Sequence, residues 1–174
     1  MDLATKAAEF AKQAHGDQRR KYTNVPYFTH LHDVATLLHD NDLSDVVVAA
    51  GYLHDTLEDT ATTRQQLEAQ FGLTVARLVC EVTDVSKPED GNRKTRKALD
   101  RDHLAKSSPD GASIKLADLI SNTRDIVANA PDFAKVYLAE KADLLPVLRH
   151  GDPSLWNKAQ ALLEVSKAML ADVE

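Results

Sequence analysis

The sequence predicts an all-α fold of about eight to ten helices, and three observations support this prediction. The 174 residues are 43% apolar and 28% charged but only 5% aromatic, which suits one compact helical core. Glycine and proline number only six each, and long stretches rich in Ala, Leu, Glu, Lys and Asp favour helices. Because no linker, internal repeat or low-complexity segment interrupts the pattern, we expect residues 1–174 to form a single domain.

The N-terminal half begins with a helix whose Ala and Phe side chains form a broad apolar stripe, and Gly16 is expected to end it. A polar, basic loop over residues 17–26 then leads into the next helix, so that His30 lies at a loop-to-helix junction. The third helix, capped by Ser44 or Asp45, is expected to run to about Asp59. The helices expected in this half span about residues 3–15, 30–38, 45–59, 63–71 and 74–82.

The C-terminal half is expected to begin with a polar loop over residues 83–92, which contains Pro88 and Gly91. A basic helix follows, and then a strongly apolar helix. The last two helices are amphipathic, and Pro146 should kink the first of them near its end. The helices expected in this half span about residues 93–106, 112–128, 133–148 and 154–173.

The net charge of −6 argues against general binding to nucleic acid, because duplex affinity depends on many contacts from Lys and Arg to phosphate. Basic residues nevertheless gather in two places, residues 19–21 and residues 93–101. Local basic groups on an acidic protein suit a small polyanion, because field focusing in a cleft depends on nearby charge. The second group also fits a solvated helix face with i,i+4 ion pairs, so both interpretations of it remain open.

Cellular location is indicated by cysteine content and by the absence of targeting patterns. The lone Cys80 lies in an apolar pattern and cannot form an internal disulfide, so we expect a buried core residue in a reducing compartment. The N-terminus lacks a basic segment followed by an apolar one, and no apolar run approaches the length of about 18 residues needed for a membrane span. We therefore expect a cytoplasmic protein without membrane contact.

The chemistry is concentrated in residues 51–60, Gly-Tyr-Leu-His-Asp-Thr-Leu-Glu-Asp-Thr. Five ionisable side chains fall in this short segment, directly after the apolar residues 46–50. Burying an imidazole and carboxylates without partners costs several kcal/mol, and a bound metal ion is the simplest partner. Helical spacing would place His54 and Glu58 on one face, so that the segment offers metal ligands together with a general base.

Asp118 extends this segment into a candidate metal site. It lies in the most apolar helix of the C-terminal half, where a carboxylate needs a cation as partner. His30, His54, Asp55 and Asp118 together form a set of two histidines and two carboxylates that suits a divalent ion. The hard carboxylate ligands favour Mn²⁺ over Fe²⁺ or Zn²⁺. The competing histidines, in more polar surroundings, are His15, His32, His39, His103 and His150.

An HD pair followed by a distant aspartate resembles the signature of HD-domain metal-dependent phosphohydrolases. Longer matches narrow the resemblance to the hydrolase domain of RelA/SpoT homologues. They cover residues 14–21, 26–30, 53–60, 71–72, 82–83 and 115–118, with Asn122 and Arg124. The resemblance spans nearly the whole chain and leaves no room for a synthetase or regulatory region. It therefore implies an HD-domain helical bundle and a stand-alone small alarmone hydrolase.

The resemblance also implies an activity. That activity is Mn²⁺-dependent removal of the 3′-pyrophosphate from guanosine tetra- and pentaphosphate (ppGpp and pppGpp), giving GDP or GTP and pyrophosphate and lowering alarmone levels in the stringent response. His30, His54, Asp55 and Asp118 match the family's metal ligands.

The remaining site residues follow from the same resemblance. Glu58 and Asp59 match the acidic pair that positions and deprotonates the attacking water. Arg20 and Lys21 match the basic pair at the purine nucleotide substrate. Asn122 matches a nucleotide-contacting position. Tyr137 either lines the same pocket or packs in the core.

Four positions depart from the family pattern and keep other functions open. Leu31 replaces a common Pro, Leu119 a common Lys or Arg, and Ser121 a common His or Tyr, while Asn24 stands in a loop that usually contains Gly. We expect Asn24 to adopt the left-handed conformation there. The enzymatic alternatives are hydrolysis of an adenosine alarmone such as ppApp, or removal of the 2′-phosphate of NADPH. The non-enzymatic alternative is a nucleotide-binding or metal-stabilised interaction module.

Overall fold

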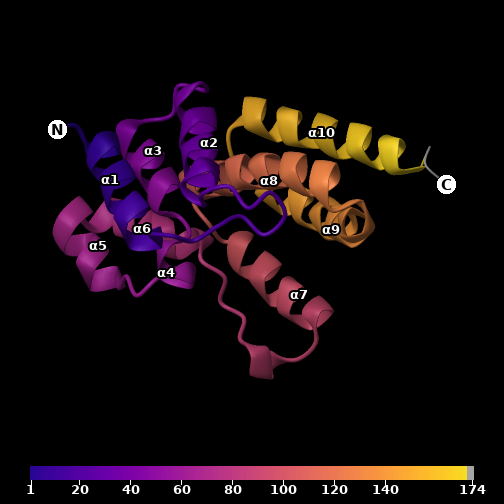
Figure 1. Cartoon of the computed structure of the whole chain (residues 1–174), viewed down its shortest axis with the longest axis horizontal. Coiled ribbons are helices and arrows are strands. Elements are labelled where there is room, and N and C mark those ends of the chain that lie inside the picture. Colours follow the sequence, from indigo (N-terminus) through magenta and orange to yellow (C-terminus); the bar gives the residue numbers. More distant parts are fainter. Residues whose placement is uncertain (172–174) are drawn as a thin grey trace.

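The computed structural model describes residues 1–171 and is all-α, as the sequence predicts. Within that range it contains ten α-helices and two short 3₁₀ helices (Figure 1). In chain order they are α1 (Leu3–His15), α2 (Phe28–His39), α3 (Asp45–Leu53), α4 (Thr56–Asp59), α5 (Arg64–Phe71), α6 (Leu73–Val82), η1 (Pro88–Asp90), α7 (Arg93–Leu104), α8 (Pro109–Asn129), α9 (Pro131–Leu144), η2 (Leu145–Leu148) and α10 (Pro153–Ala171).

Helix α8 is the central element of the bundle. It packs against α2, α3 and α6 on one side and against α9 and α10 on the other. Figure 1 shows the N-terminal helices at one end of the long axis, α9 and α10 at the other, and α7 projecting below them. The apolar side chains of α8 are almost fully buried, as are those of α2, α3 and α6 that face them. A single continuous core therefore joins the two halves of the chain and fixes α8 against α2 and α3.

The segment over residues 45–59 is not one helix, and that prediction is wrong. The structure ends α3 at Leu53 and begins the one-turn helix α4 at Thr56. His54 Nδ1 donates to the Gly51 carbonyl (2.7 Å) and Thr56 Oγ1 to the Leu53 carbonyl (2.7 Å). These two side chains occupy carbonyls that a continuing helix would use for its own backbone, which explains why the helix breaks here.

Other boundaries shift by a few residues. The apolar helix α8 begins at Pro109, because Ser108 caps it by accepting from the Gly111 N–H (3.1 Å). Helix α6 begins at Leu73, one residue before the expected start. Pro146 interrupts α9 as predicted, and the chain continues there as the 3₁₀ helix η2. The last helix is described to Ala171, so its expected end at Val173 lies outside the described residues.

The loop between α1 and α2 is a short hairpin. Arg19 and Pro26 form an isolated antiparallel bridge, and the Arg20 N–H donates to the Val25 carbonyl (2.9 Å). Asn24 has a φ of 56°, which confirms the expected left-handed conformation at the tip. The hairpin is therefore an ordered segment, although its residues are mostly polar.

Two expectations about location have different outcomes. Cys80 is partly exposed, so the prediction of a buried core cysteine is wrong, although local burial still raises the pKa of its thiol. Within residues 1–171, none of the helices combines the length and the apolar character needed to cross a bilayer.

Candidate metal centre and adjoining cleft

Four elements bring the predicted metal ligands together. His30 lies in the first turn of α2, His54 directly follows α3, Asp55 precedes α4, and Asp118 lies in the middle of α8. Both imidazoles are buried, and the two carboxylate side chains are only 15% and 9% exposed. The break between α3 and α4 turns His54 and Asp55 toward the same point, which a continuous helix would not do.

The ligand atoms of the four residues converge. The two Nε2 atoms of His30 and His54 lie 3.3 Å apart. Asp55 Oδ2 lies 3.0 Å from His54 Nε2 and 3.6 Å from His30 Nε2. Asp118 Oδ1 lies 3.2 Å from His30 Nε2 and 3.6 Å from His54 Nε2. His30, His54 and Asp55 offer ligand atoms close enough together to hold one divalent cation. Asp118 Oδ1 lies against both imidazoles and extends this group to the predicted four residues.

Outer contacts fix the orientation of these ligands. His54 Nδ1 donates to the Gly51 carbonyl, and His30 Nδ1 lies 2.9 Å from Ser121 Oγ. Each imidazole therefore has its Nδ1 engaged and presents Nε2 to the centre. The Tyr27 hydroxyl donates to Asp55 Oδ2 (2.6 Å). Ser121, which departs from the common family residue, keeps a hydrogen-bonding group at this position.

Electrostatics keep the two carboxylates ionised. Burial opposes ionisation, but the His54 imidazole holds the pKa of Asp55 below its usual range. Burial also opposes ionisation of Asp118, whose pKa is nevertheless held well below its usual value by the Lys115 ammonium and by hydrogen bonds to the two histidines. Burial alone would lower the pKa of His54, but Asp55 and Asp118 raise it well above its ordinary value. Asp55 and Asp118 are thus ionised, as carboxylate ligands of a cation must be.

The two predicted catalytic acids flank the cluster on the one-turn helix α4. Glu58 Oε1 accepts from the Asp84 N–H (2.6 Å), and Asp59 Oδ2 accepts from Gln18 Nε2 (3.0 Å). The Glu58 side chain reaches solvent, yet protein surrounds much of its carboxylate. That burial raises the pKa of Glu58 to about 7; the Lys115 ammonium opposes the increase, and the charges of Asp84 and Asp55 add to it. A carboxylate with this pKa is suited to accept a proton near neutral pH.

Lys115 also lies at the site, although no role was predicted for it. Its Nζ lies 2.9 Å from Asp118 Oδ2, one helical turn away on α8. Burial alone would lower the pKa of Lys115, but Asp118, Asp84 and Glu58 raise it above its ordinary value. The signal that could have identified it is a lysine three residues before the buried aspartate in an otherwise apolar helix.

Of the four predicted substrate residues, Asn122 contacts a predicted metal ligand, and the others have different surroundings. Asn122 Nδ2 donates to Asp118 Oδ1 (2.7 Å), and its Oδ1 accepts from Arg20 (3.3 Å). Arg20 is buried and forms an ion pair with Asp125 (3.0 Å), while Lys21 is exposed. Tyr137 is buried, and its hydroxyl contacts Thr123 Oγ1 (3.3 Å). Asn122 thus contacts the predicted ligand Asp118 directly, whereas Arg20 is connected to it only through Asn122.

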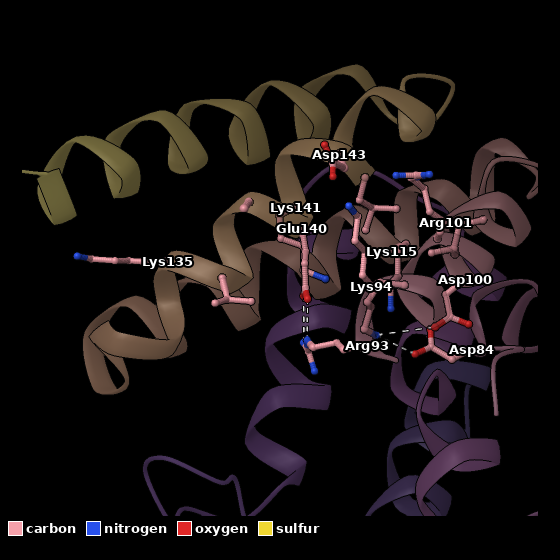
Figure 2. Close-up of a pocket in the computed structure, with 16 residues that line it drawn as sticks. Asp84, Arg93, Lys94, Asp100, Arg101, Lys115, Lys135, Glu140, Lys141 and Asp143 are labelled. Carbon is pink, nitrogen blue, oxygen red and sulfur yellow. Dashed lines mark hydrogen bonds and ion pairs between the residues drawn. The ribbon is translucent and has the colours of Figure 1, made fainter. Parts of the chain in front are cut away.

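A cavity of about 750 Å³ adjoins the metal ligands through Lys115. It lies between α7 and α9, and Figure 2 shows charged side chains of both signs around it. Arg93 pairs with Glu140 (2.6 Å), and Lys97 with Asp84 (3.3 Å). Burial and the charges of Lys115 and Lys97 lower the pKa of Lys141 to about 8. The basic side chains that line it are Arg93, Lys94, Lys97, Arg101, Lys115, Lys135 and Lys141.

The fold and the metal cluster agree with a comparison against protein families. Residues 7–145 match the model of the HD domain, so the chain belongs to the HD-domain family. A curated human relative, the guanosine-3′,5′-bis(diphosphate) 3′-pyrophosphohydrolase MESH1, is 42% identical over 129 residues, which cover 72% of this chain and 70% of that protein. A Brucella suis relative, the GTP pyrophosphokinase rsh, is 28% identical and is matched over 99% of this chain but only 26% of its own length.

Solved structures extend the comparison. One, described as a metazoan ortholog of SpoT that hydrolyzes ppGpp, superposes with a TM-score of 0.84 and 30% identity, covering 94% of this chain and 95% of that one. A Listeria monocytogenes protein shares the fold with a TM-score of 0.67 and 23% identity, covering 83% of this chain. The expected HD-domain fold is therefore confirmed.

Proposed function

We propose that this protein hydrolyses the 3′-pyrophosphate of guanosine tetra- and pentaphosphate, giving GDP or GTP and pyrophosphate. The observation that carries this proposal is the convergence of His30, His54, Asp55 and Asp118 within 3.6 Å contacts, beside the acidic pair of α4. The similarity to relatives whose names state this activity supports the choice of substrate. We also propose that the protein is a cytoplasmic, single-domain enzyme and that its substrate is a small purine nucleotide.

The proposed cofactor is one divalent cation, with Mn²⁺ favoured by the two carboxylate ligands. His30, His54, Asp55 and Asp118 would hold it. When bound, such an ion neutralises charge on the phosphate and lowers the pKa of a coordinated water.

The chain's own residues would supply proton transfer and substrate binding. The Glu58 carboxylate, with a pKa near neutrality, accepts the proton of the attacking water, and Asp59 holds that water in place. As the new bond to phosphorus forms, the bond from phosphorus to the ribose 3′-oxygen breaks and pyrophosphate leaves. Arg20 and Lys21 bind the purine and a phosphate, and Asn122 fixes the nucleotide beside Asp118. Tyr137 would border the nucleotide from α9.

The cavity between α7 and α9 supports a polyphosphate substrate. Of the two interpretations that the sequence left open for residues 93–101, the geometry favours the one involving a polyanion. Arg93, Lys94, Lys97 and Arg101 all line the cavity, which reaches Asp118 through Lys115. Several lysines and arginines in one concave space raise the local concentration of a multiply charged anion despite the overall net charge of −6.

A hydrolysis assay tests the proposal. Purified protein is incubated with ppGpp, ppApp or NADPH, with Mn²⁺ or with chelator, and the products are separated by ion-exchange chromatography. We expect GDP and pyrophosphate from ppGpp only when Mn²⁺ is present. Phosphate release from NADPH alone would overturn the choice of substrate. Metal binding without turnover of any of the three would favour the interaction module.

Two variants test the roles of the acidic pair. Glu58→Gln and Asp59→Asn should each lower kcat by at least about 100-fold, because general base catalysis contributes about 10²–10⁴-fold. Mn²⁺ affinity should be retained, since neither residue belongs to the ligand set. Unchanged turnover in either variant would remove that residue from the proposed water-activating pair.

A further inference from the structure

Asp59 is held by a side chain from the loop that follows α1. Gln18 Nε2 donates to Asp59 Oδ2 (3.0 Å), and Gln18 Oε1 lies 2.7 Å from His15 Nδ1. Within residues 1–171 we find no hydrogen bond to the other carboxylate oxygen, Oδ1. One oxygen of Asp59 is therefore fixed, and the other remains for a ligand or water.

The chemistry of these groups sets the direction of each hydrogen bond. An ionised carboxylate only accepts, so the amide nitrogen of Gln18 must face Asp59. The amide oxygen of Gln18 then faces His15, which must carry its proton on Nδ1 to donate. The two hydrogen bonds therefore point in one direction: His15 donates to Gln18, and Gln18 donates to the carboxylate of Asp59.

His15 and Gln18 are themselves held in place by other contacts. The Gln18 N–H donates to the His15 carbonyl (2.9 Å), and the Gln18 carbonyl accepts from the Tyr27 N–H (2.8 Å). His15 is only 5% exposed, and its ring stacks on Tyr27 with centroids 5.0 Å apart. The sequence placed His15 in more polar surroundings, which is wrong. Gln18 is thus held in a fixed position, from which its hydrogen bond can orient the Asp59 carboxylate.

Helix α4 needs such an external anchor. It is a single turn of four residues, and a helix of that length is not stable alone. Tyr27 contacts Asp55 at its start, and Gln18 contacts Asp59 at its end. We propose that His15 and Gln18 are positioning residues that hold the Asp59 carboxylate for catalysis. This inference rests on the proposed function, in which Asp59 positions the attacking water.

The first test compares Gln18→Met with Gln13→Met. Methionine keeps the length of glutamine but cannot donate a hydrogen bond, and Gln13 is an exposed residue of α1. With ppGpp and Mn²⁺, we expect Gln18→Met to lower kcat by about 10- to 100-fold, the usual effect of losing an orienting partner. KM should change less than about twofold, and Mn²⁺ affinity and Tm should match those of Gln13→Met. An unchanged kcat would overturn the proposal.

A double-mutant cycle separates this proposal from the proposed function. If Gln18 acts only through Asp59, Gln18→Met should cause no further loss in an Asp59→Ala background. If Asp59→Ala is itself fully active, the catalytic role of Asp59 fails, and the positioning role fails with it. If Asp59→Ala is impaired while Gln18→Met is normal, the proposed function survives and the present inference is overturned.

Two variants of His15 provide an independent test, because they distinguish a hydrogen-bonding role from a packing role. His15→Asn places an amide donor near the position of Nδ1, whereas His15→Leu fills the space without a donor. We expect His15→Leu to lower kcat by about tenfold and His15→Asn to retain most of the activity. Equal loss in both variants would show that His15 only packs against Tyr27, and would overturn its positioning role.

Discussion

Each metal ligand has a second polar contact that holds it in place. Ser121 engages His30, a backbone carbonyl engages His54, Tyr27 engages Asp55, and Lys115 engages Asp118. A ligand held in this way loses little conformational freedom when the ion binds, so less of the binding free energy is spent on ordering side chains. Ion affinity should therefore depend on residues that never touch the ion.

Ser121→Ala tests this dependence. It removes the partner of His30 Nδ1 and leaves all four ligands in place, so we expect Mn²⁺ affinity to fall about tenfold. Competition with a chelator of known affinity measures the change. The matched control is Ser166→Ala, which removes a buried hydroxyl from α10, a helix without metal ligands. Equal affinities in the two variants would contradict the prediction.

The pKa of Glu58 predicts how activity depends on pH. Burial raises this pKa to about 7, so the carboxyl is largely protonated below pH 7 and cannot accept a proton. We expect kcat/KM for ppGpp to rise with pH and to level off above about pH 7. Steady-state rates from pH 5 to 9 at saturating Mn²⁺ measure this profile. A flat profile over that interval would exclude Glu58 as the base.

The sequence predicts which types of residue form the site, but it does not predict the contacts between them. Buried carboxylates and histidines in apolar helices indicate a cation, and this pattern predicts Asp118 as a ligand. Lys115 was missed because a single lysine in a helix is ordinarily a surface residue. The roles of Gln18 and Tyr27 depend on the hairpin that brings residues 18 and 27 together, and this pairing of residues distant in sequence leaves no local pattern.

Among the elements, the pairing of α2 with α3 sets the distance between the two histidines. Gly51 permits close contact there, since a Cβ at this position would lie 2.5 Å from Leu38 Cδ1. Helical periodicity predicted both helices, yet it also predicted one unbroken segment to Asp59. The break follows from side chains that compete for backbone carbonyls, an effect that hydrophobic periodicity does not report.

Gly51→Ala tests the importance of this close contact. Leu38 must move to admit the new methyl group, so we expect a loss of about 1–3 kcal/mol in the free energy of unfolding. Movement of α3 relative to α2 should also weaken Mn²⁺ binding. Urea denaturation and metal titration measure the two effects. Unchanged stability and unchanged affinity together would show that Leu38 absorbs the added volume without moving either helix.

At the scale of the whole molecule, basic side chains gather around one cavity of an acidic protein, which is also lined by the carboxylates of Asp84, Asp100, Glu140 and Asp143. The net charge is −6, yet seven basic side chains line the space between α7 and α9. Lys141 has no carboxylate within ion-pair distance in the described part of the chain, residues 1–171. Its ammonium lies over the Tyr137 ring, 4.8 Å from the centroid. An ammonium without an ion-pair partner attracts a polyphosphate more strongly in a concave space than on an open surface.

Lys141→Met and rising salt should therefore both weaken the electrostatic attraction between the cavity and the substrate. We expect the variant to raise KM for ppGpp about tenfold at low salt, and the difference to shrink as NaCl screens the charge. Lys158→Met serves as the control, because this exposed lysine on α10 lies outside the cavity lining. Equal KM values for the two variants at 20 mM salt would contradict the prediction.

The central position of α8 has a consequence for synthesis on the ribosome. His30, His54 and Asp55 leave the ribosome early, but Asp118 follows only with α8, against which α2, α3 and α6 pack. A nascent chain that ends before α8 therefore lacks both the last ligand and the centre of its core. Capture of the ion and completion of the fold depend on the same helix, so a truncated translation product cannot hold the ion with the full ligand set.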